Sequence, residues 1–175
     1  VKLFFDHIAG KLTNYDLVYS LALATFEEKE YSYALENGWI PLSWYYEKLN
    51  EMTWINARGC RLVLSKFTFS KKQRKILNTK NITVKIFDKL DNNLRNIVSD
   101  IYKKYIQHKD YYEKGNEDDS EIFIRDDPIS WKYFIYYYNN VPVAFTELEV
   151  FTDEHVLTGQ FAWDYSNPKL SLGTY

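Results

Sequence analysis

The chain has a single cysteine, Cys60, among its 175 residues. One cysteine excludes an internal disulfide and any metal site built from several cysteines, and it suits a protein of the reducing cytosol. Long apolar runs are also missing, so the sequence predicts no membrane-spanning segment, and its first residues lack the pattern of a signal peptide. We therefore expect a cytoplasmic protein that does not bind membranes.

A charge excess of either sign is lacking too. The formal net charge is −2 at pH 7, so no overall field attracts the protein to nucleic acid, and a polyanionic partner must be bound by a local basic patch. Hydrophobic residues make up 46% of the chain, which is enough for one folded domain with a buried core. The chain starts at Val1 instead of methionine and ends in LSLGTY, which looks like the start of another element. We therefore expect a fragment whose C-terminal part is absent.

Apolar spacing near the N-terminus predicts helices. Tyr15–Glu30 has apolar residues at helical spacing and a polar end, and Thr13 or Asn14 is placed to cap its start. Tyr31–Asn37 continues helically until Gly38, a typical C-terminal stop.

The middle of the chain alternates extended and helical patterns. In order, it predicts an edge segment, a strand, a short helix and a second strand: Trp39–Tyr46 with Pro41, Cys60–Phe67, Lys71–Asn78 capped by Ser70, and Ile82–Phe87. The strongest helical pattern is Asp88–Gln107. Its apolar residues recur at i, i+4, i+7, i+8 and i+11 and define one face: Leu90, Leu94, Ile97, Val98, Ile101, Tyr102 and Tyr105.

The last third predicts an antiparallel meander after a polar loop at residues 109–127. Three aromatic or β-branched runs, at residues 131–138, 141–151 and 155–165, are separated by Asn139-Asn140 and Thr152-Asp153-Glu154, which suit hairpin turns. After Pro168, a helix is expected to begin near Ser171. The order predicts an α+β protein with one mixed, mainly antiparallel sheet flanked by helices. We expect a single domain over residues 1–175, in which residues 1–50 are a helical N-terminal extension.

Basic side chains crowd into the stretch Ser70–Lys75. It follows a predicted strand, so four cations lie at the beginning of a helix: Lys71, Lys72, Arg74 and Lys75. The helix dipole disfavours cations at this end, and a bound anion would offset that cost. A solvated basic turn is the alternative, and composition alone favours it.

Two further stretches are candidates for binding. Arg58 and Arg61 flank a glycine before a predicted strand, and they would either hold a carboxylate by paired hydrogen bonds or form surface salt bridges. Near the end of the chain, Gly173 lies in a strand–turn–helix where the backbone can approach a ligand and free N–H groups can hold a phosphate or a carbonyl. An ordinary helix start explains that pattern equally.

Metal chemistry has no support in the sequence. Cys60 is expected to be a small buried hydrophobe. The acidic run Glu117–Glu121 does not have the spacing of a calcium loop, and the three histidines do not have that of metal ligands: His7, His108 and His155. We expect neither a metal nor a bound cofactor.

From Ile82 onward, the predicted order is that of the GNAT acyltransferase fold: strand, long helix, polar loop, three antiparallel strands and a glycine-containing turn. Within that fold, the chain resembles the arginyl/leucyl-tRNA–protein transferase family. The resemblance covers about Tyr31 to Tyr175 and rests on ALENGWIPLS, on ARGCRLVLSKFTFSKKQRKILN with ITVKIF behind it, and on FAWDYSNPKLSLGTY. SKKQRK together with SLGTY is its specific part.

The resemblance implies an acyltransferase that moves an aminoacyl group from tRNA to the N-terminal amine of a protein, as in the N-degron pathway. Aminoacyl-tRNA would be the co-substrate, and neither DNA nor membranes are implied. The tRNA phosphates would lie near Lys71, Lys72, Gln73, Arg74 and Lys75. An acceptor with an acidic first residue would lie near Arg58 and Arg61. The acyl donor would be framed by Trp163, Ser171, Leu172, Gly173 and Thr174, with Asp164 accepting the proton of the amine.

The chain also departs from the family pattern. Family members often carry a cysteine-rich segment before the arginine strand, where this chain has Ile55 and Asn56, and they continue past SLGTY. Two alternatives stay open. One is an acyl-CoA-dependent N-acetyltransferase, although the final turn has one glycine and no arginine to face a pyrophosphate. The other is a non-catalytic interaction module of the same fold.

Overall fold

The computed structural model describes residues 1–12, 15–42, 52–57, 62–78, 81–109, 130–170 and 172–174. Contacts divide the chain into two compact units. The first unit is Val1–Ser65 with Thr152–His155, and the second unit is Lys66–Phe151 with Val156–Tyr175. The single-domain organisation expected from the sequence stays a prediction.

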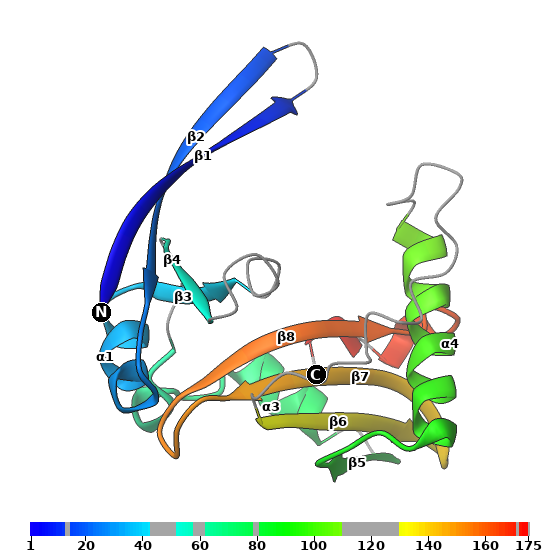
Figure 1. Cartoon of the computed structure of the whole chain (residues 1–175). Helices are drawn as coiled ribbons and strands as arrows, with labels where there is room; N and C mark the ends of the chain where they lie inside the picture. Colours follow the sequence, from blue (N-terminus) through cyan, green and yellow to red (C-terminus); the bar gives the residue numbers. More distant parts are fainter. Residues whose placement is uncertain are drawn as a thin grey trace. The chain divides into compact units, whose positions relative to one another are not determined.

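The first unit is built on a four-stranded antiparallel sheet (Figure 1). Its strand order is β1-β2-β4-β3, with the bounds Lys2–Leu12, Tyr15–Thr25, Thr53–Asn56 and Trp39–Leu42. β1 and β2 pair along their whole length, from Lys2 opposite Thr25 to Leu12 opposite Tyr15. Between β2 and β3 lie a 3₁₀ turn, η1 (Glu28–Glu30), and the helix α1 (Tyr31–Glu36).

The helix expected over Tyr15–Glu30 is wrong, because Tyr15–Thr25 forms β2. The stretch also carries a period of two, in which large apolar residues from Tyr15 to Leu23 alternate with Asp, Val, Ser and Ala. Because most of its residues are apolar, the stretch fits both the helical period of 3.6 residues and the strand period of two. Pairing with β1 selects the strand. The expected helical extension is therefore mainly strand in its described part. The expected cap, Thr13 or Asn14, lies outside the described residues.

Other expectations for the first unit are confirmed. The helix α1 ends at Glu36 with Asn37 as its cap, and the expected stop, Gly38, follows with a φ of +83°, a left-handed conformation that glycine adopts without strain. The described part of the expected edge segment, Trp39–Leu42, forms β3 at one edge of the sheet, where a residue without an N–H such as Pro41 is tolerated, and residues 43–46 lie outside the described residues. Trp54 of β4 is fully buried, and its ring packs edge-on against Phe26 with centroids 5.6 Å apart.

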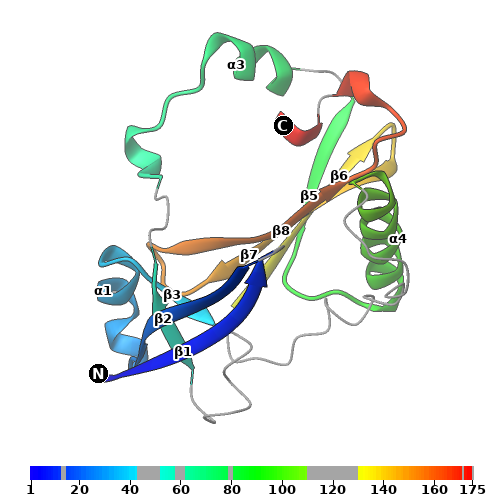
Figure 2. The ribbon, with the colours of Figure 1, turned by 90° about the horizontal axis from the view of Figure 1, so that it is seen from above.

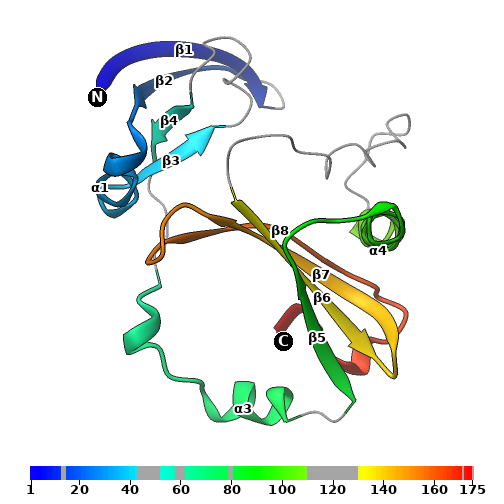
Figure 3. The same ribbon diagram turned by 60° about the horizontal axis from the view of Figure 1, so that its bottom comes forward.

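The second unit contains the remaining sheet, with the strand order β5-β6-β7-β8 and antiparallel pairs throughout. These strands are Ile82–Phe87, Ser130–Tyr138, Val141–Val150 and Val156–Trp163. The short helix α3 (Lys71–Leu77) precedes β5 and is set apart from the sheet in Figure 2. The long helix α4 (Asn92–Lys109) packs on β7 and β8, and Figure 3 looks nearly along its axis. Two 3₁₀ turns follow β8: η5 (Pro168–Leu170) and η6 (Leu172–Thr174).

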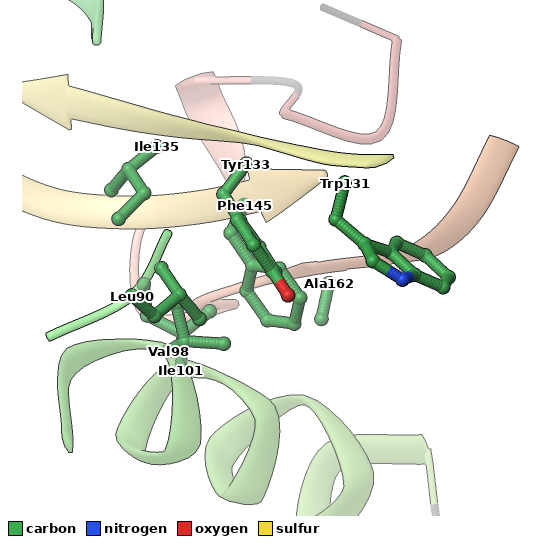
Figure 4. Packing of buried hydrophobic residues seen from close by; sticks show 8 residues of the cluster. All are labelled: Leu90, Val98, Ile101, Trp131, Tyr133, Ile135, Phe145 and Ala162. Atoms are coloured by element: carbon green, nitrogen blue, oxygen red, sulfur yellow. The ribbon is translucent and has the colours of Figure 1, made fainter. Parts of the chain in front are cut away.

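The core of the second unit lies between α4 and the sheet. Figure 4 shows side chains from the helix side pointing toward Tyr133, Ile135 and Phe145 of the strands. The helix begins at Asn92, four residues later than expected, so Leu90 lies before it. All seven residues of the expected apolar face nevertheless belong to the core or pack against it: Leu90, Leu94, Ile97, Val98, Ile101, Tyr102 and Tyr105. A smaller cluster around Ala144, Leu170 and Leu172 packs against other side chains of the sheet.

The meander and its turns are confirmed as well. Asn139 and Asn140 have φ values of 49° and 65°, the left-handed pair that a tight hairpin needs. At the next turn, the Thr152 hydroxyl accepts hydrogen bonds from the N–H groups of Glu154 and His155. The α+β class is thus confirmed.

Two expectations about the sheets are wrong. Instead of one mixed sheet, the described strands form two separate antiparallel sheets. The strand expected over Cys60–Phe67 is not formed by its described part, which contains the 3₁₀ turn η3 (Leu64–Lys66) and exposes Leu64 to 71%. An apolar run forms a strand only where a neighbouring strand offers backbone partners, and neither sheet takes up these residues.

Candidate functional site

The described residues that are expected to act fall into two groups, both in the second unit. The basic group lies on α3, and the acyl-donor group lies at the end of β8 and in η6. Three expected site residues lie outside the described residues: Arg58, Arg61 and Ser171. Thr174 lies in η6.

The helix α3 begins with a reciprocal cap. The N–H of Gln73 donates to the Ser70 hydroxyl at 3.2 Å, and the N–H of Ser70 donates to Gln73 Oε1 at 2.9 Å. These bonds confirm Ser70 as the cap, and they show that the side chain of Gln73 is part of the same cap. The four cations of α3 are exposed: Lys71, Lys72, Arg74 and Lys75.

The surroundings of α3 strengthen its positive charge. Residues 62–87 contain no aspartate or glutamate, although the whole chain is slightly acidic. Directly before the helix, Phe67 and Phe69 form an edge-on pair with centroids 4.9 Å apart, and Phe69 is exposed. Such a surface is suited to a polyanion, because solvated cations approach phosphates at little desolvation cost.

At the other candidate position, the end of β8 meets the last turns of α4 in a group of four rings. We call this group the aromatic stack: Tyr105, His108, Trp163 and Tyr165. His108 and Tyr165 are nearly parallel, with centroids 3.6 Å apart and an interplanar angle of 17°. Trp163 lies 4.9 Å from Tyr105 and 5.0 Å from Tyr165, measured between centroids. The ammonium of Lys109 lies 5.6–6.0 Å from the centroids of the three larger rings.

Sequence reasoning identified Trp163 but missed its partners on α4. The spacing of Tyr105, His108 and Lys109 at i, i+3 and i+4 was the available signal, because it places all three on one face of a helix. The spacing does not reveal that Tyr105 and His108 contact the rings of Trp163 and Tyr165 at the end of β8.

Asp164 is held by several groups. Its carboxylate accepts hydrogen bonds from Lys104 Nζ at 2.9 Å and from the N–H of Ser166 at 2.8 Å, and its own N–H donates to the Val143 carbonyl. Burial raises the pKa of the carboxyl group, but the hydrogen bonds from Ser166 and Lys104 and the charge of Lys104 outweigh it. The pKa therefore lies below its ordinary value of 3.8. A carboxylate with a lowered pKa is a weak proton acceptor, so this arrangement favours a positioning role.

Gly173 is in close contact with the aromatic stack. A Cβ at this position would lie 2.9 Å from Cζ2 and 3.1 Å from Cη2 of Trp163. The neighbouring Leu172 is 3% exposed. The structure thus brings Trp163, Leu172 and Gly173 together, and packing alone accounts for the glycine and for the leucine.

A buried carboxylate lies elsewhere in the sheet. Glu147 of β7 is 1% exposed, and a Cβ on Gly159 of β8 would lie 3.2 Å from its Cβ and 3.3 Å from its Oε2. The pairing of β7 with β8 is irregular here. The sequence signal was the alternation from Phe145 to Glu147, which puts both on the same face of β7.

Within the described part of the chain, no three His, Cys, Asp or Glu side chains gather as metal ligands would. No helix among the described residues is long and apolar enough to cross a membrane. Compared with models of known protein families, the chain matches none, and it matches no curated protein.

Proposed function

We propose that the chain is an acyltransferase similar to the arginyl/leucyl-tRNA–protein transferases, with a GNAT-like fold. It would move an aminoacyl group from tRNA to the N-terminal amine of a protein. The observation that carries the proposal is the capped, exposed basic helix α3 in a chain whose net charge is −2. The antiparallel sheet β5–β8 with α4 packed on it is consistent with a GNAT-like arrangement.

The role of α3 is to bind tRNA phosphates. Four cations within five residues repel one another, and the first of them oppose the helix dipole. A polyanion relieves both costs. The reciprocal cap of Ser70 and Gln73 fixes the beginning of the helix without using any of the four cations.

The reaction needs little from the protein beyond orientation. The amine nitrogen attacks the carbonyl carbon of the aminoacyl ester, the carbon–oxygen bond to the terminal ribose breaks, and the proton of the amine ends on the ribose hydroxyl. Trp163 and the backbone near Gly173 would position the donor. Asp164, already bound to Lys104, would fix this lysine and the end of β8 instead of taking up the proton. Arg58 and Arg61 would bind an acidic first residue of the acceptor.

The test is a tRNA-binding titration across a salt series, with two double variants that each remove two exposed lysines. One is K71A/K72A on α3, and the matched control is K89A/K103A elsewhere in the second unit. If α3 binds phosphates, K71A/K72A weakens binding and reduces the slope of log affinity against log salt by roughly 1.4–1.8, whereas the control changes neither. Equal effects of the two variants would contradict the assignment to α3.

Acetyl-CoA is titrated in parallel. Tight binding of acetyl-CoA without tRNA binding would overturn the proposal in favour of the small-molecule acyltransferase. Binding of neither would favour the non-catalytic module. Transfer of a labelled amino acid from charged tRNA to a peptide with an acidic first residue then tests the chemical step itself.

A further inference from the structure

We propose that Thr152, His155 and Glu36 form a pH-sensitive clasp at the turn between β7 and β8. The His155 ring is bound by Thr152 while it is neutral and by Glu36 once it is protonated. The turn residues Thr152–His155 belong to the first unit, as does Glu36 at the end of α1. The clasp is independent of the proposed acyltransferase function, because it rests on contacts within this unit alone.

The hydrogen bonds of Thr152 determine which nitrogen of the ring carries the hydrogen. The Thr152 hydroxyl oxygen accepts the N–H of Glu154 at 3.2 Å and the N–H of His155 at 3.1 Å. These two bonds use both lone pairs of the oxygen. The same oxygen lies 3.0 Å from Nδ1 of His155, so the hydroxyl donates its own hydrogen to this nitrogen. Nδ1 is therefore unprotonated, and the hydrogen of the neutral ring is on Nε2.

The opposite nitrogen of the ring faces a carboxylate. Nε2 of His155 lies 3.6 Å from Oε1 of Glu36, and the histidine side chain is only 15% exposed. Glu36 is the only charged residue of α1. The two other titratable residues of this helix, Tyr31 and Tyr33, carry phenols, which are uncharged near neutral pH. The charge that α1 offers to the ring is therefore negative.

Protonation of the ring breaks the first contact and strengthens the second. An imidazolium has a hydrogen on both nitrogens, so Nδ1 can no longer accept the hydrogen of the Thr152 hydroxyl. The hydroxyl oxygen can accept Nδ1–H only if it releases the N–H of Glu154 or of His155. In contrast, the positive ring is attracted by Glu36, and the exposed turn residues Asp153 and Glu154 are acidic as well. Histidine changes its charge between pH 5 and pH 8, so the exchange occurs within the physiological range.

An ordinary turn accounts for only part of this network. A threonine hydroxyl that accepts the N–H groups two and three residues later is a common way to close a turn, and it needs no histidine. Such a turn requires neither a ring nitrogen at the hydrogen of the hydroxyl nor a carboxylate of another element at the opposite nitrogen. These two contacts make this turn sensitive to pH.

NMR spectra of the full chain, recorded from pH 8 to pH 5, test the clasp. At pH 8, the nitrogen shifts of the His155 ring should show its hydrogen on Nε2. As the pH falls, the amide shift of Glu154 should change with the same midpoint as the ring, because this N–H is bonded to the Thr152 hydroxyl. H155Q should abolish the change, whereas the matched control H108Q, at an exposed histidine of the second unit, should leave it intact.

Variants of the two partners separate the halves of the clasp. T152S keeps the hydroxyl and should retain the pH-dependent shift of Glu154, whereas T152V should lose it although the ring still titrates. E36Q should lower the pH at which the His155 ring is half protonated by about 0.2–0.7 units, because the imidazolium loses a nearby negative charge.

Three results would overturn the clasp. The first is a neutral His155 ring with its hydrogen on Nδ1. The second is a Glu154 amide shift that stays constant from pH 8 to pH 5, or that changes equally in T152V. The third is an E36Q ring that titrates at the same pH as in wild type.

Discussion

Replacing Gly173 with alanine tests whether this glycine is required by packing. The added methyl would lie 2.9 Å from Cζ2 of Trp163, about 0.6 Å short of the roughly 3.5 Å at which carbon atoms rest. The indole has little room to retreat, because its ring is surrounded by Tyr105, Phe161 and Tyr165 at centroid distances of 4.9–5.1 Å. Overpacking of this kind destabilises a protein by about 1–3 kcal/mol.

Urea denaturation followed by circular dichroism measures the effect. With a typical slope of about 2 kcal/mol per molar urea, G173A should lower the midpoint by roughly 0.5–1.5 M. A double-mutant cycle with W163F identifies the cause, because phenylalanine lacks the two indole carbons that the methyl approaches most closely. In the W163F background, G173A should cost clearly less than in wild type.

The reasoning is refuted if G173A unfolds at the same urea concentration as wild type, or if the two substitutions are additive. An unchanged midpoint would mean that the turn after β8 shifts to accommodate the methyl group, and additivity would mean that the cost of G173A does not come from the indole of Trp163.

Two further predictions concern groups near the candidate sites. D164N should be less stable than wild type at pH 7 by about 0.5–1 kcal/mol, because the ion pair with Lys104 is lost. Since the folded pKa of Asp164 is lowered, its stabilisation is present above the ordinary value of 3.8 and is lost as the pH falls through the folded pKa. The difference in stability should therefore shrink in acid, and a constant difference from pH 7 to pH 3 would contradict this origin. S70A should weaken α3 by about 1 kcal/mol and speed amide exchange at residues 71–78, whereas S70T should not.

The second unit was largely predictable because its signals are local and agree with one another. The apolar residues of α4 from Leu94 to Tyr105 follow one clear helical period, and Asn139-Asn140 is a pair typical of tight hairpin turns. Tyr15–Thr25 differs, because a uniformly apolar stretch fits a helix or a strand, and only its pairing with β1 decides. The strand expected to include Leu62–Leu64 is not formed, since no strand among the described residues pairs with them.

The candidate site was predictable only in part. Ser70 and the cations of α3 follow from a sequence motif, and the structure bears out the cap. The neighbours of Trp163 do not, because Tyr105 and Lys109 reach it from a helix far away in the chain. Contacts of this kind depend on where α4 lies on the sheet, which no local pattern encodes.

The order of strands in the second sheet has a consequence for how the chain folds. Because β6, β7 and β8 neighbour one another both in the sheet and in the sequence, they can pair hairpin by hairpin through short turns. β5 must instead find β6 across residues 88–129, which include all of α4. Closing that longer loop loses more chain entropy before any contact is gained. The meander can therefore form first and serve as a template. The strand β5 and the helix α4 then dock onto it, and the docking of α4 brings Tyr105 and His108 to the other rings of the aromatic stack.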